Sequence, residues 1–197
     1  MKVLLINGSP KRERSDTLRV SRAFLKGLGE SYEQVDTSVL HVQPCLGCYG
    51  CWRNGGHCVL PHDDGADVLE KITQSDLVIW SFPLYNFGMP AHMKAVVDRM
   101  LPLCTGTQVT DENGHTYHPL RKEKKMTMMM ISGCGFADFK GNYDAMLLQF
   151  ARTFGEGFPR IVCVEAPLLN IPDAAPLADA YLALCEQAGR EYAKDER

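Results

Sequence analysis

The stretch KVLLINGSPKRERSDTL, residues 2–18, decides the fold. Its apolar run at residues 3–6 is typical of a parallel strand covered on both faces, and the polar residues 7–10 end that strand. Ser15, Asp16 and Thr17 can each cap the helix that follows. The first N–H groups and the positive dipole end of that helix would then face any anion in the loop, as in a phosphate-binding site.

The loop between this strand and helix carries the positive charges of Lys11, Arg12 and Arg14. Its glycine spacing matches neither G-x-G-x-x-G nor G-x-x-x-x-G-K-[ST], which disfavours a dinucleotide fingerprint and a nucleoside-triphosphate loop. The alternative to a phosphate site is an ordinary strand-to-helix turn with a solvated basic rim.

The run GSPKRERSDTL resembles the FMN-phosphate loop of the flavodoxin-like NAD(P)H-dependent FMN reductases, whose usual form is GSPR followed by a Ser/Asn/Thr cluster. Here Lys11 stands where Arg is commoner and Asp16 where Asn is commoner. We expect Asp16 to cap the helix, because an inward-facing carboxylate would repel a phosphate. The resemblance implies that the phosphate is bound by Ser9, Lys11, Ser15 and Thr17.

Length, composition and charge limit the class of protein. With 197 residues and 45% hydrophobic content, the chain can bury one sizeable core, so we expect a single domain over residues 1–197. The net charge of −3 provides no general attraction to nucleic acid or to a membrane. Only about four apolar residues precede the first polar loop, too few for a signal peptide. We therefore expect a cytoplasmic protein whose eight cysteines are thiols or metal ligands, not disulfides.

Predicted strands and helices alternate along the chain, which indicates an α/β fold with a parallel, three-layer, doubly wound sheet. The strand order 2-1-3-4-5 is implied by the family resemblance. Asn113-Gly114, flanked by the short segments 108–110 and 115–117, predicts a hairpin insertion at residues 105–120, and Gly27 with Gly29 is expected to stop the first helix. The predicted strands are 3–6, 32–40, 77–82, 125–132 and 160–164, and the helices are 18–28, 64–75, 91–100, 143–154 and 176–192.

The stretch FPLYNFGMPAHMKAVVDR, residues 82–99, resembles the second signature of the same family, in which a strand ends in Ser/Thr-Pro-x-Tyr and Gly-x-Pro precedes a helix. An isoalloxazine ring needs an apolar surface for its faces and polar groups along its edge. Alternatively, these aromatic side chains fold back onto the core. A third loop, after the fourth strand, should reach the same end of the sheet. The candidate flavin contacts are Pro83, Leu84, Tyr85, Asn86, Phe87, Gly88, Met89, Gly133, Cys134 and Gly135.

Residues 44–63 form a cysteine-rich loop with the spacing C-x2-C-x2-C-x6-C. Three cysteines within seven residues favour an iron–sulfur cluster over zinc, which usually takes two separated pairs. The loop resembles the cluster motif of the iron–sulfur flavoproteins, a branch of the same family, and this resemblance implies a [4Fe-4S] cluster. Zinc and plain or redox-active thiols stay open as alternatives. The candidate ligands are Cys45, Cys48, Cys51 and Cys58.

The resemblance implies an FMN-dependent oxidoreductase that passes electrons from NADPH, NADH or a reduced protein to a small-molecule or protein acceptor. No side chain has to act as acid or base, because the flavin carries the chemistry. Family members associate as homodimers or homotetramers, which we expect here as well. The alternative is a redox-sensing or electron-transfer module that binds a flavin or a cluster without steady turnover.

Overall fold

Five parallel strands form the central sheet of the computed structural model, in the order β2-β1-β3-β6-β7. The structure describes residues 1–121, 127–131, 141, 144–146, 148–149, 160–162 and 175–195. The strands of the sheet are β1 (Val3–Asn7), β2 (Tyr32–Asp36), β3 (Leu77–Ser81), β6 (Thr127–Ile131) and β7 (Arg160–Val162).

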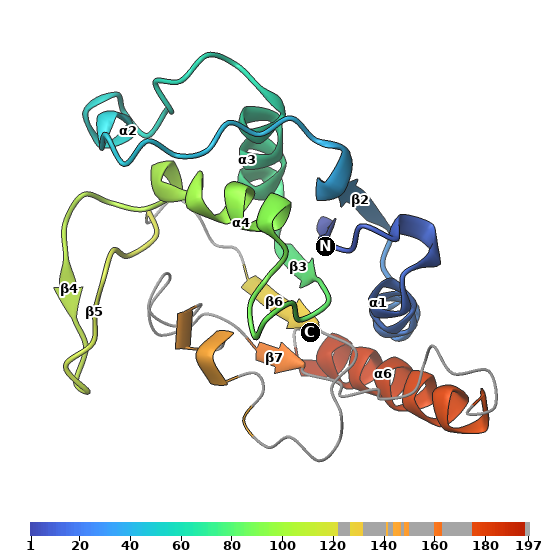
Figure 1. Cartoon of the computed structure of the whole chain (residues 1–197). Coiled ribbons are helices and arrows are strands. Elements are labelled where there is room, and N and C mark those ends of the chain that lie inside the picture. Colours follow the sequence, from blue (N-terminus) through green and yellow to red (C-terminus); the bar gives the residue numbers. More distant parts are fainter. Residues whose placement is uncertain are drawn as a thin grey trace.

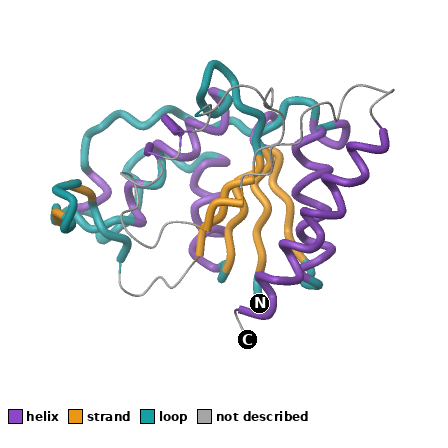
Figure 2. Tube along the Cα trace, turned by 90° about the horizontal axis from the view of Figure 1, so that it is seen from below, coloured by secondary structure: helices purple, strands orange, loops and turns teal. Residues whose placement is uncertain are grey.

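Helices cover both faces of this sheet, as Figures 1 and 2 show. The helices α1 (Asp16–Leu28) and α6 (Ala175–Asp195) lie on one face, and α3 (Asp64–Gln74) and α4 (Ala91–Asp98) lie on the other. The predicted α/β fold class with three layers is therefore confirmed. Within the described residues, no helix combines the length and apolar character needed to cross a membrane.

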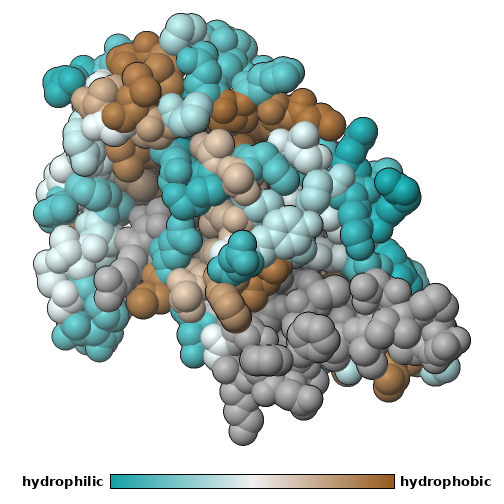
Figure 3. All heavy atoms as spheres, in the orientation of Figure 1, coloured by the Kyte–Doolittle hydropathy of each residue, from teal (hydrophilic) through white to brown (hydrophobic). Residues whose placement is uncertain are grey.

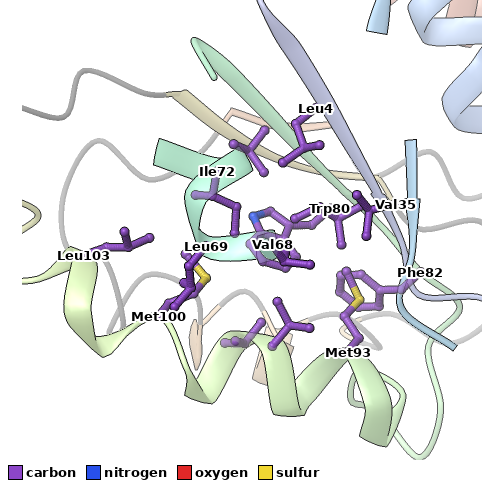
Figure 4. Close-up of a cluster of buried hydrophobic side chains, with 14 of the residues drawn as sticks. Leu4, Val35, Val68, Leu69, Ile72, Trp80, Phe82, Met93, Met100 and Leu103 are labelled. Atoms are coloured by element: carbon purple, nitrogen blue, oxygen red, sulfur yellow. The ribbon is translucent and has the colours of Figure 1, made fainter. Parts of the chain in front are cut away.

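The two layers of helices explain why the strands are apolar at every position. In β1, Val3 and Leu5 pack in the cluster formed with α1 and α6, whereas Leu4 and Ile6 pack in the cluster formed with α3 and α4. Successive side chains of a strand point to opposite faces, so a strand covered on both sides has no polar face. Figure 4 shows the second of these clusters, in which Trp80 of β3 lies among side chains of α3.

Two glycines bring α1 and α6 into backbone contact. A Cβ atom on Gly27 would lie 1.9 Å from the carbonyl oxygen of Glu186, and one on Gly189 would lie 2.0 Å from that of Phe24. The helix continues through Gly27 and ends at Gly29, which adopts the left-handed conformation with φ +75°. The prediction that Gly27 helps to stop the helix is therefore wrong: its role is to admit the neighbouring helix.

Two predicted elements end earlier than expected, and each is followed by a 3-10 turn. The second strand ends at Asp36 and not at residue 40, because a 3-10 turn, η2 (Thr37–Val39), follows and the Thr37 hydroxyl donates to the Asn7 carbonyl oxygen. The helix predicted to reach residue 100 ends at Asp98. A second 3-10 turn, η3 (Leu101–Leu103), follows it, and Pro102 within that turn has no N–H to donate to the Asp98 carbonyl oxygen, as a continued α-helix would require.

The predicted hairpin insertion is present as β4 (Val109–Thr110) and β5 (Thr116–Tyr117). Its connection is wider than a two-residue turn: the Asp111 carboxylate accepts hydrogen bonds from the N–H groups of Asn113 and His115. The predicted fourth helix is helical at its described residues, 144–146 and 148–149, and its other residues lie outside the described part of the chain.

Candidate functional site

The first loop, residues 8–15, is fixed at its start by a side chain that the sequence analysis did not identify. Asn7, the last residue of β1, is fully buried. Its Oδ1 accepts a hydrogen bond from the Ser9 N–H (3.1 Å), and its Nδ2 donates to Asp36 Oδ1 (2.7 Å). Asn7 therefore joins the end of β1 to the end of β2 and sets where the first loop begins.

The first loop ends at Ser15, which caps α1. Its backbone is extended, and its Oγ accepts a hydrogen bond from the Leu18 N–H (3.2 Å). The prediction that Asp16 is the cap is wrong, because Asp16 is already the first helical residue. The Asp16 carboxylate instead pairs with Lys11 Nζ (3.7 Å) and Arg19 Nη1 (3.4 Å). The charge of Lys11 is thus shared with Asp16 and is not free for a phosphate alone.

The donors around the start of α1 match the chemistry of a phosphate. Within the described part of the chain, the N–H groups of Asp16 and Thr17 make no hydrogen bond, as is usual in the first turn of a helix. The Ser15 hydroxyl accepts from the helix and can still donate its own proton. Ser9, Ser15 and Thr17 are at most 2% exposed, so a phosphate would reach their hydroxyls only if the first loop opened.

The second loop, residues 82–90, displays aromatic side chains. Tyr85 and Gly88 exchange two backbone hydrogen bonds of 2.8 and 2.9 Å, and the residues between them, Asn86 and Phe87, have positive φ angles of 49° and 61°. Positive φ is strained for a bulky residue such as phenylalanine and recurs at functional sites. Tyr85 is 46% exposed and Phe87 is 62% exposed, which rules out the alternative that these rings fold back onto the core.

The rest of the second loop attaches it to the core. Leu84 and Met89 are half-buried and pack against the cluster between the sheet and the helices α3 and α4. Pro83 and Gly88 are also half-buried. The third predicted contact region, Gly133, Cys134 and Gly135, lies outside the described residues.

The start of the first loop packs against the first residue of the second loop and against the strand and helix on either side of it. The Gly8 N–H donates to the Ser81 carbonyl oxygen (2.7 Å), and the His92 ring nitrogen Nε2 lies 2.8 Å from the Gly8 carbonyl oxygen. A Cβ atom on Gly8 would lie 2.4 Å from Met93 Sδ and 2.9 Å from Phe82 Cβ. Only glycine fits there without displacing these neighbours. The sequence analysis missed His92, whose position two residues after Pro90 in the second signature was the available signal.

The cysteine loop, residues 44–63, contains a short helix, α2 (Gly50–Arg53). Cys45, Cys48, Cys51 and Cys58 line one small cavity together. The N–H of Gly47 lies 3.5 Å from Cys45 Sγ, and that of Gly50 lies 3.5 Å from Cys48 Sγ. Hydrogen bonds to sulfur are one means by which proteins tune iron–sulfur clusters. The structure thus gathers all four predicted ligands around one space.

The arrangement of these sulfur atoms is not that of a bound metal. Across the described residues, no three Cys, His, Asp or Glu side chains are placed closely enough to hold a metal ion. Burial raises the pKa of the Cys51 thiol, with the neighbouring Cys58 and Cys45 adding to the rise. The residue types fit a thiolate-bound cluster, and the four side chains share one cavity but do not converge on the site of a single metal ion.

A buried ion pair closes the neck of the cysteine loop. The guanidinium of Arg99, the residue after α4, contacts both carboxylate oxygens of Asp63 at 2.8 and 3.1 Å, and the Arg99 side chain is 1% exposed. Arg99 also donates to the Gln43 carbonyl oxygen (3.0 Å), while the Gln43 N–H donates to Asp63 (2.8 Å). Both ends of the cysteine loop are therefore joined to the helix that starts at the second loop.

Aromatic stacking attaches the cysteine loop at α2. The rings of Tyr49 and Trp52 stack with centroids 4.9 Å apart, and the ring of His118, just after β5, lies 4.6 Å from Trp52 on centroids. The Trp52 indole N–H donates to the Leu101 carbonyl oxygen (3.2 Å). The hairpin insertion thus supports the cysteine loop, which its sequence did not suggest.

Two cysteines outside the cysteine loop are packing residues. Cys104 and Cys185 are buried, and burial raises the pKa of each thiol to about 11. At neutral pH both are therefore protonated and unreactive.

Comparison with known proteins relates the chain to redox flavoproteins. An iron-sulfur flavoprotein of Methanocaldococcus jannaschii is 34% identical over 116 residues, which are 58% of this chain and 59% of that protein. One of Archaeoglobus fulgidus is 35% identical over 104 residues, covering 52% and 46% of the two chains. The chain thus covers less than two thirds of the length of these relatives. An FMN-dependent NADH:quinone oxidoreductase of Trichormus variabilis is 26% identical over 73% of this chain and 75% of its own.

Solved structures share the fold at low identity. An NAD(P)H:quinone oxidoreductase from Methanothermobacter marburgensis superposes with a TM-score of 0.70 at 19% identity, covering 98% of this chain and 96% of the other. This likeness concerns the fold alone. A family model described as flavodoxin-like fold matches residues 1–171. Because that match covers most of the chain and the sheet and helices agree with it, the chain belongs to this flavodoxin-like family.

Proposed function

We propose that the protein is an FMN-dependent oxidoreductase. The observation that carries this proposal is the packing of Gly8, at the start of the first loop, against Phe82 at the start of the second loop and against the first turn of α4. The second loop also displays the exposed rings of Tyr85 and Phe87. A phosphate-binding element and an apolar ring surface at one end of a sheet are what a flavin nucleotide requires. The names of the relatives, FMN-dependent quinone oxidoreductases and iron-sulfur flavoproteins, support the same conclusion.

In this proposal the chain binds and orients the cofactor. The N–H groups at the start of α1 and the hydroxyls of Ser9, Ser15 and Thr17 hold the phosphate, with Lys11 at the rim. The aromatic rings of the second loop cover one face of the isoalloxazine. Bound FMN would take electrons from NAD(P)H or a reduced protein and pass them to a small-molecule or protein acceptor.

Phosphate binding is tested by comparing FMN with riboflavin, which lacks the phosphate. A Ser9→Ala/Thr17→Ala double variant should lose about 1–3 kcal/mol of FMN binding free energy for each hydrogen bond removed, and riboflavin binding should not change. The matched control is Thr110→Ala/Thr116→Ala, which removes two hydroxyls of the hairpin that bond each other. Equal weakening of both ligands in the first double variant would place the phosphate elsewhere.

The second candidate is a two-centre protein in which the cysteine loop holds a [4Fe-4S] cluster. It is favoured by the single cavity that all four cysteines line. Protein purified without oxygen would then contain about four irons and four sulfides per chain, and a Cys48→Ala variant would lose them while still binding FMN. The two-centre hypothesis is contradicted if the protein takes up no iron on anaerobic reconstitution and its four loop thiols react freely. The protein would then be a reductase with FMN as its one cofactor.

Steady turnover separates an enzyme from a redox sensor. With excess NADH or NADPH and a simple quinone acceptor, an enzyme consumes the donor continuously, whereas a sensor is reduced once and then stops. The same assay identifies the preferred nicotinamide. A single domain over residues 1–197, assembly as a homodimer or homotetramer, and cytoplasmic location stay predictions, which mass measurement and cell fractionation would test.

A further inference from the structure

A cavity of about 700 Å³ lies between the cysteine loop and α3, away from the first and second loops. The cysteine loop contributes Gly56 and Cys58 to its wall, and α3 contributes Leu69 and Glu70. No residue of the two proposed flavin loops is among its lining residues. Its volume lies in the usual range for small-molecule sites, which are mostly apolar with a few convergent polar groups.

One polar group in the wall is the buried guanidinium of Arg99. Its Nη1 and Nη2 atoms are occupied by Asp63 and Gln43, and the Cys58 thiol also interacts with the guanidinium. Among the described residues its Nε has no hydrogen-bond partner, but that atom is covered and does not reach the cavity. Arg99 therefore holds the wall in place with Asp63 and Gln43, and a ligand needs another donor.

The second polar group is Arg121, which has no carboxylate partner within the described residues. Its Nε donates to the Pro102 carbonyl oxygen (3.1 Å). A Cβ atom on Gly56 would lie 2.9–3.0 Å from Cζ, Nε and Nη2 of Arg121, so the guanidinium lies against the glycine. Gly56 also has a φ of +88°, which disfavours any other residue. The cysteine loop is therefore shaped to place this cation in the cavity wall.

The balance of charge and surface defines the ligand. Asp63 offsets the charge of Arg99, and the exposed Glu70 opposes part of that of Arg121, so a second negative charge on the ligand would not be compensated. The apolar part of the cavity wall is formed by Leu69, Pro102 and Leu103. We propose that this cavity binds a small organic monocarboxylate with an apolar body, whose carboxylate is held by Arg121.

This site is independent of the proposed flavin chemistry, and it has a consequence for the cysteine loop. Cys58 lines this cavity as well as the one shared by the four cysteines, whereas Cys48 lines only cavities other than this one. An occupant beside Arg121 would cover the Cys58 thiol and leave Cys48 exposed. Ligand binding can therefore be measured as slower alkylation of Cys58 with unchanged alkylation of Cys48.

The experiment uses 2-naphthoate as the probe and the full-length protein loaded with FMN, whose retention reports that each variant is folded. Titration calorimetry should show one saturable site per chain, with affinity lowered about tenfold or more in Arg121→Gln. The matched control, Arg53→Gln, removes an exposed arginine of the cysteine loop that does not line this cavity. It should bind like the unchanged protein, and the neutral analogue 2-naphthol should bind no better to the unchanged protein than to Arg121→Gln.

Thiol protection supplies the second readout. In the unchanged protein, 2-naphthoate should slow alkylation of Cys58 by iodoacetamide and leave that of Cys48 unchanged, and Arg121→Gln should abolish this protection. If Arg121→Gln does not retain FMN, Gly56→Ala, which displaces the guanidinium, replaces it in both assays. The proposal is overturned by absence of saturable binding, by equal binding in Arg121→Gln, or by equal protection of Cys48 and Cys58.

Discussion

The two proposed flavin loops and the cysteine loop are built in different ways. The flavin loops are short continuations of buried strands: Asn7 and Ser81, at the strand ends, are both 0% exposed. The cysteine loop spans residues 44–63 with one four-residue helix, and it is held by an ion pair at its neck and an aromatic stack at α2. The first region is fixed by the sheet itself, and the second by a few side chains from distant parts of the chain.

The surface of the two regions differs as well. Around α2, Leu46, Tyr49 and Val59 are 71%, 52% and 53% exposed, and Figure 3 shows hydrophobic residues gathered at that end of the molecule. In the second loop, the exposed apolar side chains are the two aromatic rings proposed to face the flavin. Variants that act on one region and spare the other therefore test whether the regions are independent.

The largest effect is expected from the neck of the cysteine loop. Arg99→Met leaves the Asp63 carboxylate buried without its partner, which typically costs about 3–5 kcal/mol of unfolding free energy. The control is Lys94→Met, which breaks an exposed ion pair with Asp98 on the same helix and should cost less than about 1 kcal/mol. Urea titration measures the unfolding free energy of both variants. If both lose a similarly small amount, the Arg99–Asp63 pair contributes little to stability.

The same ion pair predicts how stability depends on pH. Burial alone would raise the pKa of Asp63, but the hydrogen bonds from Arg99 and Gln43 outweigh it and lower the pKa below its ordinary value. Its contribution to stability is therefore complete above the ordinary aspartate pKa and is lost as the pH falls through the lowered value. In urea titrations at several pH values, Asp63→Asn should reduce the fall in unfolding free energy that accompanies acidification. If that fall is unchanged in the variant, other carboxylates cause the pH dependence.

A smaller effect is expected at the contact between the two flavin loops. Gly8→Ala forces a methyl group against Phe82 and Met93, and such overpacking costs about 1–3 kcal/mol. Because the same contact aligns the loops, FMN affinity should fall too, while the reactivity of Cys48 should not change. Gly88→Ala is the stability control, since its Cβ would have no neighbour closer than 3.6 Å. Equal loss of stability in the two variants would contradict the role of Gly8.

The smallest effect on stability is expected at α2. Trp52→Phe keeps a ring in the stack but removes the hydrogen bond to the Leu101 carbonyl oxygen, a loss of about 1 kcal/mol. The buried Cys51 thiol should then be alkylated faster, with FMN affinity unchanged. Val109→Ala, in the exposed hairpin, should alter neither property. A fall in FMN affinity as large as the rise in Cys51 reactivity would show that the two regions are coupled.

Local patterns of sequence determined the fold class and the location of the candidate site. Continuous apolar runs predicted strands covered on both faces, and the polar or aromatic residues that follow β1 and β3 predicted the two loops that meet at one end of the sheet. These features depend on neighbouring residues, since strand period, helix capping and turn formation act over a few positions. The exposure of Tyr85 and Phe87 required the structure, because composition alone allows a ring to fold inward.

Only the tertiary structure decided how the cysteine loop is held. Arg99 and Asp63 pair across 36 residues, and Trp52 of the loop packs against the ring of His118, just after the hairpin. Gly27 was predicted to stop a helix, whereas its role is set by the close approach of α6. Nothing in the local sequence specifies such partners, because each contact depends on where the sheet and helices bring distant segments together. The sequence by itself therefore determined which elements form and which residues are suited to chemistry, and packing decided which of them meet.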